Sequence, residues 1–509
     1  MELFQDYFNR QKTTVIFSFL CSIFILFSVM FFSSCNNFGS FSKFSQDYLD
    51  DNMLVMVYVA GANSLRNEVL MDINSMEKGL FLTQENGMSK LKVVALVDKD
   101  ISIGSESWTG SMLYEIEPYN TDLNSLKIHS KVIENASNSL GEWRTSSEQE
   151  EDMGNIHTLE NFVLWARENY PEYRKHSLIL WNHGGGVYSD FEPQRNICTD
   201  NESGPTSESL DNTLYIGEIS QLLDRLYPSD SPLEFLGMDA CLMGMYEVAY
   251  QFRNSVKYMT FSPAIEWGGW NYEYIFSQPS SNESGKNFAI NVVDGYKKAY
   301  SSIYPNNTMT AVDLQFVSDL KTEIDNLSFS LGQEFLADKT AFREKIEKVR
   351  SNSIFMHPKD EPSVIVSSNL LRYPYYELGT LLRCFVNENP TLKNDNKVEF
   401  SVSTESAAWQ TQVILEKMIL KTWLGGGYGD AYIESENLNS NFVFEENIPY
   451  GISIFFSNKN NYLHHGFYTS DKAGSPGVLG YGSIDAANKT DNGIIDTWAE
   501  LQFELFSIE

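Results

Sequence analysis

The chain has 509 residues, enough for two domains or for one large catalytic domain with appendages. Hydrophobic residues make up 42% and aromatic residues 14%, so a sizeable core is expected and global disorder is excluded. With 68 acidic against 37 basic residues, the formal net charge of −31 argues against nucleic acid as a partner, because phosphate binding needs a basic surface.

The first segment has the pattern of an export signal. Two basic residues precede a charge-free, mostly apolar run over residues 13–32, and two serines then lead to Cys35. This pattern resembles a bacterial lipoprotein signal, so residues 1–35 are predicted to be a signal peptide that ends at a lipidated Cys35. We expect an exported protein anchored to a bacterial membrane, with the outer membrane as the first expectation. The apolar run is also close to the length of a membrane span, so an uncleaved anchor is the alternative.

After a polar tether at residues 36–50, strands and helices alternate. Residues 53–59, 67–78 and 91–97 predict a strand, a helix and a second strand. A strand–helix–strand unit of this length predicts two parallel strands in one sheet. Two further expectations follow in the chain: weakly patterned strands within residues 102–133 and a Ser/Glu-rich surface loop at residues 135–152.

The next predicted elements lead to two candidate site loops. Thr158 is expected to cap a helix over residues 158–170, followed by a buried strand at 177–181. A polar loop at 189–212 is expected next. The later elements are a helix at 216–226, a buried strand at 233–237, an amphipathic helix after Cys241 and a strand at 258–261.

Longer helices dominate after about residue 280. The expected helices cover residues 288–304, 314–335 and 342–350, and the expected strands cover residues 309–314, 398–402 and 450–456. We therefore predict an α/β fold with a mostly parallel central sheet at residues 51–305. A C-terminal α+β region at residues 306–509 is expected to pack on it.

His183 and Cys241 each follow a predicted buried strand. The carboxyl ends of such strands form the active sites of open α/β sheets. Cysteine hydrolases need a thiolate that attacks and an imidazole that protonates the leaving amine. The helix after Cys241 is expected to favour the thiolate, and the glycines after His183 allow backbone N–H groups to approach a substrate. The alternative is an inert buried thiol and a structural histidine.

The segments LILWNHGGG and GMDACLMGMYEVAY together resemble the clostripain family of cysteine peptidases, which have a caspase-like α/β/α sandwich. The resemblance spans nearly all of residues 53–460. Other segments that carry it are residues 57–60, 72–76, 152–154, 198–219, 375–379 and 450–454.

This resemblance implies a role for each residue of the two motifs. His183 would be the general acid and base and Cys241 the nucleophile, with the backbone N–H groups of Gly184 and Cys241 as the oxyanion hole. Asp239 would lie in the pocket for the residue before the cleaved bond. Since the family cuts after Arg or Lys, a buried carboxylate would pair with that side chain. A structural hydrogen bond at the strand end is the alternative for Asp239.

Further site residues rest on the same resemblance. Ser262 and Ala264 would pair with an extended substrate as an added strand. Arg195, the one basic residue in the polar loop, is the candidate for self-processing, with an ordinary exposed arginine as the alternative. No cofactor is expected to be required and no metal ligands are predicted; Ca²⁺ is possible by resemblance alone. The expected partners are protein or peptide substrates, and the membrane through the lipid on Cys35.

Two departures from the family pattern leave open whether this protein shares the family's strict preference for cleavage after Arg. Gly61 and Ala62 stand where an acidic residue is usual, and the loop at residues 263–272 is shorter than usual and lacks the proline that normally precedes its glycines. We therefore expect an exported, lipid-anchored endopeptidase that cuts after Arg or Lys. The alternatives are a caspase-like peptidase without the basic preference, and an inactive surface lipoprotein of the same fold that acts as a binding protein.

Overall fold

The computed structural model describes the folded part of the chain with gaps. The described residues are 52–85, 91–98, 110–125, 127–144, 151–187, 196–200, 212–282, 284–304, 306–356, 365–367, 370–371, 374–387, 397–428, 431–434, 449–458, 486 and 494–506. Residues Asn52–Glu509 form one compact unit. Cys35, the predicted signal and tether, and Arg195 lie outside the described residues.

A ten-stranded sheet forms the centre of the described part, in the order β17-β16-β12-β11-β10-β7-β1-β2-β3-β4. Its middle five strands are parallel: β1 (Met53–Ala60), β2 (Leu91–Asp98), β7 (Lys175–Trp181), β10 (Leu233–Asp239) and β11 (Val256–Phe261). Antiparallel strands extend it at both ends: β3 (Met112–Ile116), β4 (Lys131–Ile133), β12 (Thr308–Asp313), β16 (Ile419–Leu424) and β17 (Ala431–Glu434). The apolar runs of β1 and β10 are buried along their whole length because both faces of the sheet are covered.

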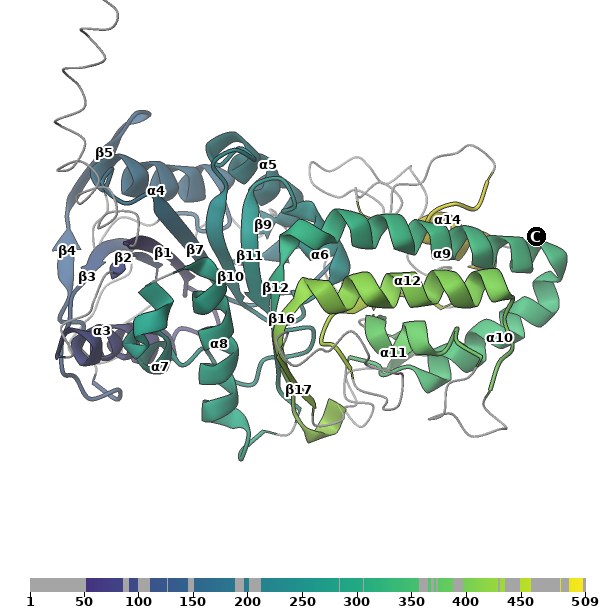
Figure 1. Ribbon diagram of the computed structural model, residues 1–509. Helices are drawn as coiled ribbons and strands as arrows, with labels where there is room; N and C mark the ends of the chain where they lie inside the picture. The colour runs from purple at the N-terminus through teal and green to yellow at the C-terminus, as the bar shows by residue number, and fades with distance from the viewer. Residues whose placement is uncertain are drawn as a thin grey trace, which may run out of the picture. The chain divides into compact units, whose positions relative to one another are not determined.

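Helices cover each face of the sheet and bury a separate hydrophobic core there (Figure 1). One face carries α3 (Val69–Glu85), α7 (Tyr272–Ser277) and α8 (Gly285–Tyr300), and the other carries α4 (Ile156–Asn169), α5 (Ile216–Leu226) and α6 (Tyr246–Gln251). The predicted α/β/α sandwich with a mostly parallel sheet is confirmed.

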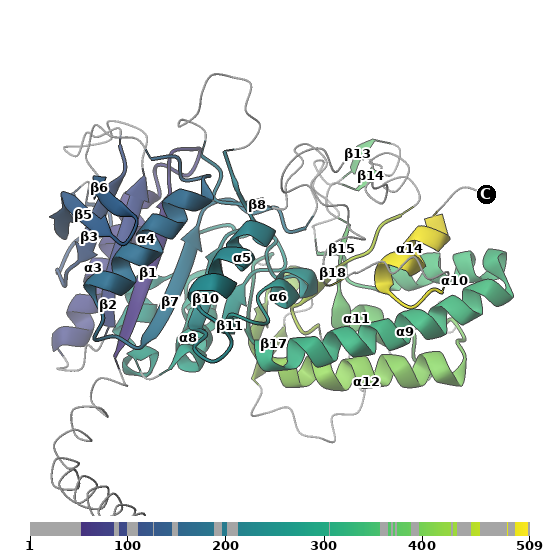
Figure 2. The ribbon, with the colours of Figure 1, turned by 90° about the horizontal axis from the view of Figure 1, so that it is seen from above.

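The C-terminal part adds a helical group beyond the β12 side of the sheet, where α9 and α12 lie side by side (Figures 1 and 2). Its helices are α9 (Val317–Ala337), α10 (Lys339–Asn352), α11 (Leu378–Arg383), α12 (Val402–Met418) and α14 (Trp498–Phe506). Since β12, β16 and β17 belong to the central sheet, that sheet continues across residue 305.

A small sheet ties this group together. Strands β15 (Tyr375–Glu377) and β18 (Ser453–Phe455) pair antiparallel. The buried carboxylate of Glu377 accepts the backbone N–H groups of Gly379, Thr380 and Tyr450. One carboxylate thus supplies hydrogen-bond acceptors for backbone N–H groups in the first turn of α11 and in the segment that leads into β18.

Several boundaries differ from those predicted. Residues 135–144 form a hairpin of β5 (Asn135–Asn138) and β6 (Gly141–Arg144) rather than a loop. Asn155, not Thr158, caps α4 by accepting the His157 N–H. The strand predicted at 398–402 is absent from described residues 397–401; Ser401 instead caps α12 through Thr404 N–H. Val398 and Phe400 are buried in the irregular segment before this helix, so their alternation reflects burial of that segment and not a strand.

The remaining short elements complete the described structure. They are β8 (Asn196–Ile197), β9 (Leu214–Tyr215), β13 (Ile365–Ser367), β14 (Leu370–Leu371), η1 (Pro279–Asn282), η2 (Leu314–Phe316) and η4 (Gly426–Tyr428). Within the described ranges, no helix is both long and apolar enough to span a membrane.

Candidate active site

The two predicted site loops lie at the same edge of the sheet. Strands β7 and β10 are parallel neighbours, with Trp181 opposite Asp239, so the residues that follow them emerge together. The N–H of Asn182 donates to the Asp239 carbonyl oxygen at 3.2 Å. A methyl group added to Gly184 would overlap the Cys241 carbonyl oxygen. The structure therefore brings the histidine loop and the cysteine loop into contact, and the close approach requires glycine at 184.

Cys241 is partly buried and is a thiol at rest. Its Sγ accepts the backbone N–H of Glu266 at 3.3 Å. Burial, and then the charge of Glu266, raise the pKa of Cys241 to about 12. The helix α6 begins only at Tyr246, so its N-terminus is not at the sulfur. The expectation that this helix favours the thiolate is wrong, because a turn separates the two and desolvation acts in the opposite direction.

His183 is exposed and makes its side-chain contact with a residue that sequence reasoning missed. Its Nε2 lies 2.7 Å from Ser64 Oγ. Its backbone N–H donates to Asn182 Oδ1. Partial burial lowers the pKa of the ring from its ordinary value. At neutral pH the resting pair is therefore a neutral imidazole and a neutral thiol.

Behind Cys241 lies a group of buried carboxylates. Asp239 Oδ2 accepts the Tyr272 hydroxyl at 2.7 Å and the Trp270 N–H at 3.2 Å. Burial raises the pKa of Asp239 to about 7, although both hydrogen bonds act to lower it. Asp72 Oδ2 accepts the Trp181 indole N–H at 2.7 Å, and burial followed by the Asp239 charge raises its pKa well above the ordinary value.

Glu266 is a residue with a buried carboxylate that the sequence analysis did not single out. Both of its carboxylate oxygens are sealed from solvent and form no hydrogen bond of normal geometry. Asp239, Trp270 and the Ala240 backbone lie close enough to shift its titration, and burial followed by the Asp239 charge raises its pKa well above the ordinary value. None of the ion pairs between described residues involves Asp72, Asp239 or Glu266. A buried acidic group without a cation favours a positively charged ligand.

Ser262 and Ala264 do not offer a free strand edge. Their carbonyl oxygens accept the N–H groups of Gly244 at 2.7 Å and Leu242 at 2.9 Å, inside the protein. The buried Ser262 hydroxyl contacts Thr308 Oγ1 at 2.6 Å. The two residues therefore support the cysteine loop, and their pairing with an extended substrate stays a prediction.

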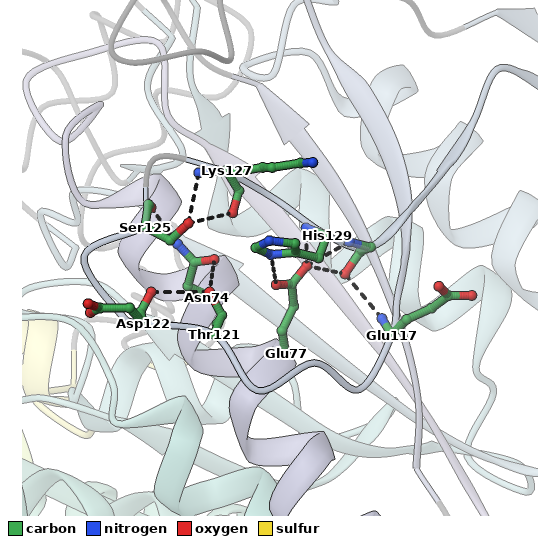
Figure 3. Close-up of polar contacts among 9 residues, drawn as sticks. Asn74, Glu77, Glu117, Thr121, Asp122, Ser125, Lys127 and His129 are labelled. Carbon is green, nitrogen blue, oxygen red and sulfur yellow. Dashed lines mark hydrogen bonds and ion pairs between the residues drawn. The ribbon is translucent and has the colours of Figure 1, made fainter.

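A further polar cluster lies on α3 and is structural (Figure 3). Glu77 accepts the backbone N–H groups of His129 and Ser130, each at 2.7 Å, and the Ser130 hydroxyl at 2.6 Å. Asn74 donates to the Ser125 carbonyl oxygen at 2.7 Å. These contacts fix the segment between β3 and β4, and their partners are already satisfied.

The described residues contain no group of three or more His, Cys, Asp or Glu side chains placed to hold a metal ion. Ser64 and Glu266 could have been suspected from sequence only by their places in the loops after β1 and β11, at the same sheet edge as His183 and Cys241.

Comparisons with known proteins identify the family of this chain. A model of the clostripain family matches residues 57–464. Clostripain of Hathewaya histolytica is 28% identical over 464 residues, which cover 83% of this chain and 78% of that protein.

Solved structures are similar as well. A secreted C11 cysteine protease of Bacteroides thetaiotaomicron, in complex with an irreversible peptide inhibitor, is 16% identical with a TM-score of 0.50, over 82% of this chain and 96% of that one. An inactive zymogen C11 protease of Parabacteroides distasonis is 17% identical with a TM-score of 0.49, over 80% and 92%. The chain belongs to the clostripain family and is a cysteine peptidase.

Proposed function

We propose that the protein is an exported, lipid-anchored endopeptidase that cuts after Arg or Lys, with Cys241 as nucleophile and His183 as general acid and base. The observation that carries the specificity is the pair of buried carboxylates, Asp239 and Glu266, directly behind Cys241. A guanidinium or ammonium group that enters this space supplies the counter-charge that the free protein lacks.

The proposed reaction starts from a neutral pair. When substrate binds, His183 accepts the thiol proton as Cys241 Sγ attacks the scissile carbonyl carbon. The negative oxygen of the tetrahedral intermediate is placed near the N–H groups of Gly184 and Cys241. The imidazolium then returns its proton to the leaving amine, and a thioester remains. Water, activated by His183, hydrolyses the thioester and restores the thiol.

The burial that raises the pKa of Cys241 also suits this reaction. A thiol that stays protonated at neutral pH is protected from adventitious oxidation and alkylation, since the thiolate is the reactive form. The thiol loses its proton only when a base accepts it, which makes the position of the His183 ring decisive.

Cleavage of reporter peptides tests the proposal. Peptides that end in Arg, Lys or citrulline before the reporter group are offered to the wild-type protein and to Cys241→Ala. We expect hydrolysis after Arg and Lys, with citrulline much slower, and no hydrolysis by Cys241→Ala. Cys384→Ala is the matched control, since Cys384 is a buried thiol distant in sequence from the site loops. Equal inactivity of wild type and Cys241→Ala would favour the alternative of a binding protein.

The anchor and the self-processing step have tests of their own. We propose lipidation at Cys35, so Cys35→Ala is expected to move the protein from the membrane fraction to the soluble fraction. We propose self-cleavage after Arg195, so active protein should carry a new N-terminus at Asn196. Absence of that terminus in active protein would remove the self-cleavage step while leaving the dyad untouched.

A further inference from the structure

The ring of His183 is in contact with the loop that follows β1. Ser64 Oγ lies 2.7 Å from His183 Nε2. Ser64 is itself exposed, so this contact does not arise from the need to satisfy a buried hydroxyl. A neutral hydroxyl against a ring nitrogen constrains both the direction of the ring and the nitrogen that carries its proton.

The loop that presents Ser64 is firmly held. Asn63 Nδ2 donates to the Ala60 carbonyl oxygen at 2.9 Å and to the Thr199 carbonyl oxygen at 3.0 Å. The N–H of Leu65 donates to Asn63 Oδ1 at 2.9 Å. The loop is therefore held by hydrogen bonds of Asn63 and Leu65, and the Ser64 hydroxyl takes part in none of them.

The contact with Ser64 determines which nitrogen of the His183 ring can exchange a proton with Cys241. With Ser64 at Nε2, the other nitrogen, Nδ1, is the one that can exchange a proton with the Cys241 thiol. When Nδ1 accepts that proton the ring becomes an imidazolium, and both nitrogens then carry hydrogen. The Ser64 oxygen can accept the Nε2–H, so it stabilises the charged ring more than the neutral one.

We propose that Ser64 is a positioning residue for catalysis: it holds His183 Nε2 and thereby assigns Nδ1 to the proton transfer with Cys241. The inference rests on the proposed His183 and Cys241 chemistry. It adds a third member to that pair, one that acts through the histidine and does not touch the substrate.

Two measurements on the full-length protein test this role. The first is kcat and KM for an Arg reporter peptide, and the second is the rate at which iodoacetamide alkylates Cys241, followed by peptide mass mapping from pH 5 to 11. For Ser64→Ala we expect kcat to fall about three- to tenfold with KM unchanged, the size of one lost neutral hydrogen bond. Alkylation at pH 7 should fall by a similar factor, and the difference should narrow towards pH 11, as the fraction of thiol that ionises without the histidine grows.

Matched variants separate this role from a structural one. Ser64→Thr keeps the hydroxyl and should restore both rates, and Ser351→Ala makes the same exchange at an exposed serine on α10 and should change neither. Profiles of Ser64→Ala that superimpose on wild type, or equal losses in Ala and Thr at every pH, would overturn the proposal. If the protein cleaves no peptide at all, the proposed function fails, while alkylation still tests the Ser64 contact.

Discussion

The two loops that carry the proposed dyad are held by different kinds of contact. In the cysteine loop the main chain is bonded on both sides: Leu242 and Gly244 donate to the Ala264 and Ser262 carbonyl oxygens at 2.9 and 2.7 Å, and the Gly244 carbonyl oxygen accepts the Ser453 N–H at 2.9 Å. This loop is also buried. It is therefore fixed by backbone bonds that no single side-chain change removes.

The histidine loop depends more on side chains from distant segments. Ser64 contacts the exposed His183 ring, and the buried Tyr375 hydroxyl donates to the Gly185 carbonyl oxygen at 2.7 Å. Rigid backbone support suits a nucleophile whose position must not vary. Side-chain support suits a ring that must change its protonation state. We therefore expect changes around the histidine to lower kcat and leave KM unchanged, whereas changes at the buried carboxylates beside Cys241 alter both kcat/KM and the free energy of unfolding.

Gly184→Ala should give the largest effect, because it forces the two loops apart. The added methyl would overlap the Cys241 carbonyl oxygen and lie 2.9 Å from the Met243 side chain. We expect kcat/KM for an Arg peptide to fall by about 10²-fold or more, the order seen when one oxyanion donor is lost. Gly217→Ala in α5 is the control: its methyl meets nothing within 4 Å. That change should retain activity and raise stability by about 0.5–1 kcal/mol. A fully active Gly184→Ala would contradict the loop contact.

Asp239→Asn should separate function from stability on the cysteine side. Loss of a charge-assisted contact should lower kcat/KM for Arg and Lys peptides by about 10- to 100-fold. The raised pKa of Asp239 means that the folded protein binds more protons than the unfolded chain between about pH 4 and 7. The stability attributable to this group therefore falls as pH rises through that window. The melting temperature of the variant should thus exceed that of wild type at pH 8 and approach it at pH 4. Lower stability at pH 8 with unchanged specificity would support a purely structural Asp239.

The preference for Arg over citrulline should depend on pH through the ionisation of Asp239. Since the pKa of Asp239 is about 7, its charge is progressively lost below neutral pH. The ratio of kcat/KM for Arg over citrulline peptides should fall as pH decreases from 7 to 5, by at most about tenfold per unit. Taking the ratio cancels the titration of the dyad, which both peptides share. A ratio independent of pH would place the recognition elsewhere.

Tyr375→Phe should give the smallest effect, on the histidine side. It removes one hydroxyl and leaves the Gly185 carbonyl oxygen without that donor, which costs about 1–3 kcal/mol for a buried acceptor. We expect kcat to fall about three- to tenfold and KM to stay unchanged, measured with the Arg peptide. Tyr432→Phe, at a half-exposed tyrosine whose hydroxyl bonds Asp294, is the comparison variant. An equal loss of kcat in both variants would show that the histidine loop does not depend on Tyr375.

The spacing of apolar residues along the sequence predicted several strands and helices of the fold correctly. The apolar runs of β1, β2 and β10 and the helix α5 were recognisable because burial imposes their periods directly. The positions of His183 and Cys241 followed from the rule that parallel strands end at one edge. Strands β16 and β17 were missed because they are defined by their pairing with β12, which no local period reveals.

The pKa shifts and the long-range contacts of the site could not be predicted from local sequence patterns. The pKa of Cys241 is raised first by burial and then by the charge of Glu266, a residue 25 positions later in the chain. Ser64 reaches His183 across 119 residues of sequence. Ser262 looks like a strand end that could accept substrate, yet its carbonyl oxygen is already used by Gly244. Contacts of this kind are set by tertiary packing, and one residue's neighbours in sequence do not disclose them.

The residues that support the Cys241 loop are synthesised late. Ser453 donates to Gly244, Phe455 N–H donates to Glu247 Oε1 at 2.9 Å, and the Trp498 indole donates to the Phe455 carbonyl oxygen at 2.8 Å. These residues leave the ribosome long after Cys241. A nascent chain therefore lacks part of the support of the Cys241 loop until residues 453–498 have been synthesised.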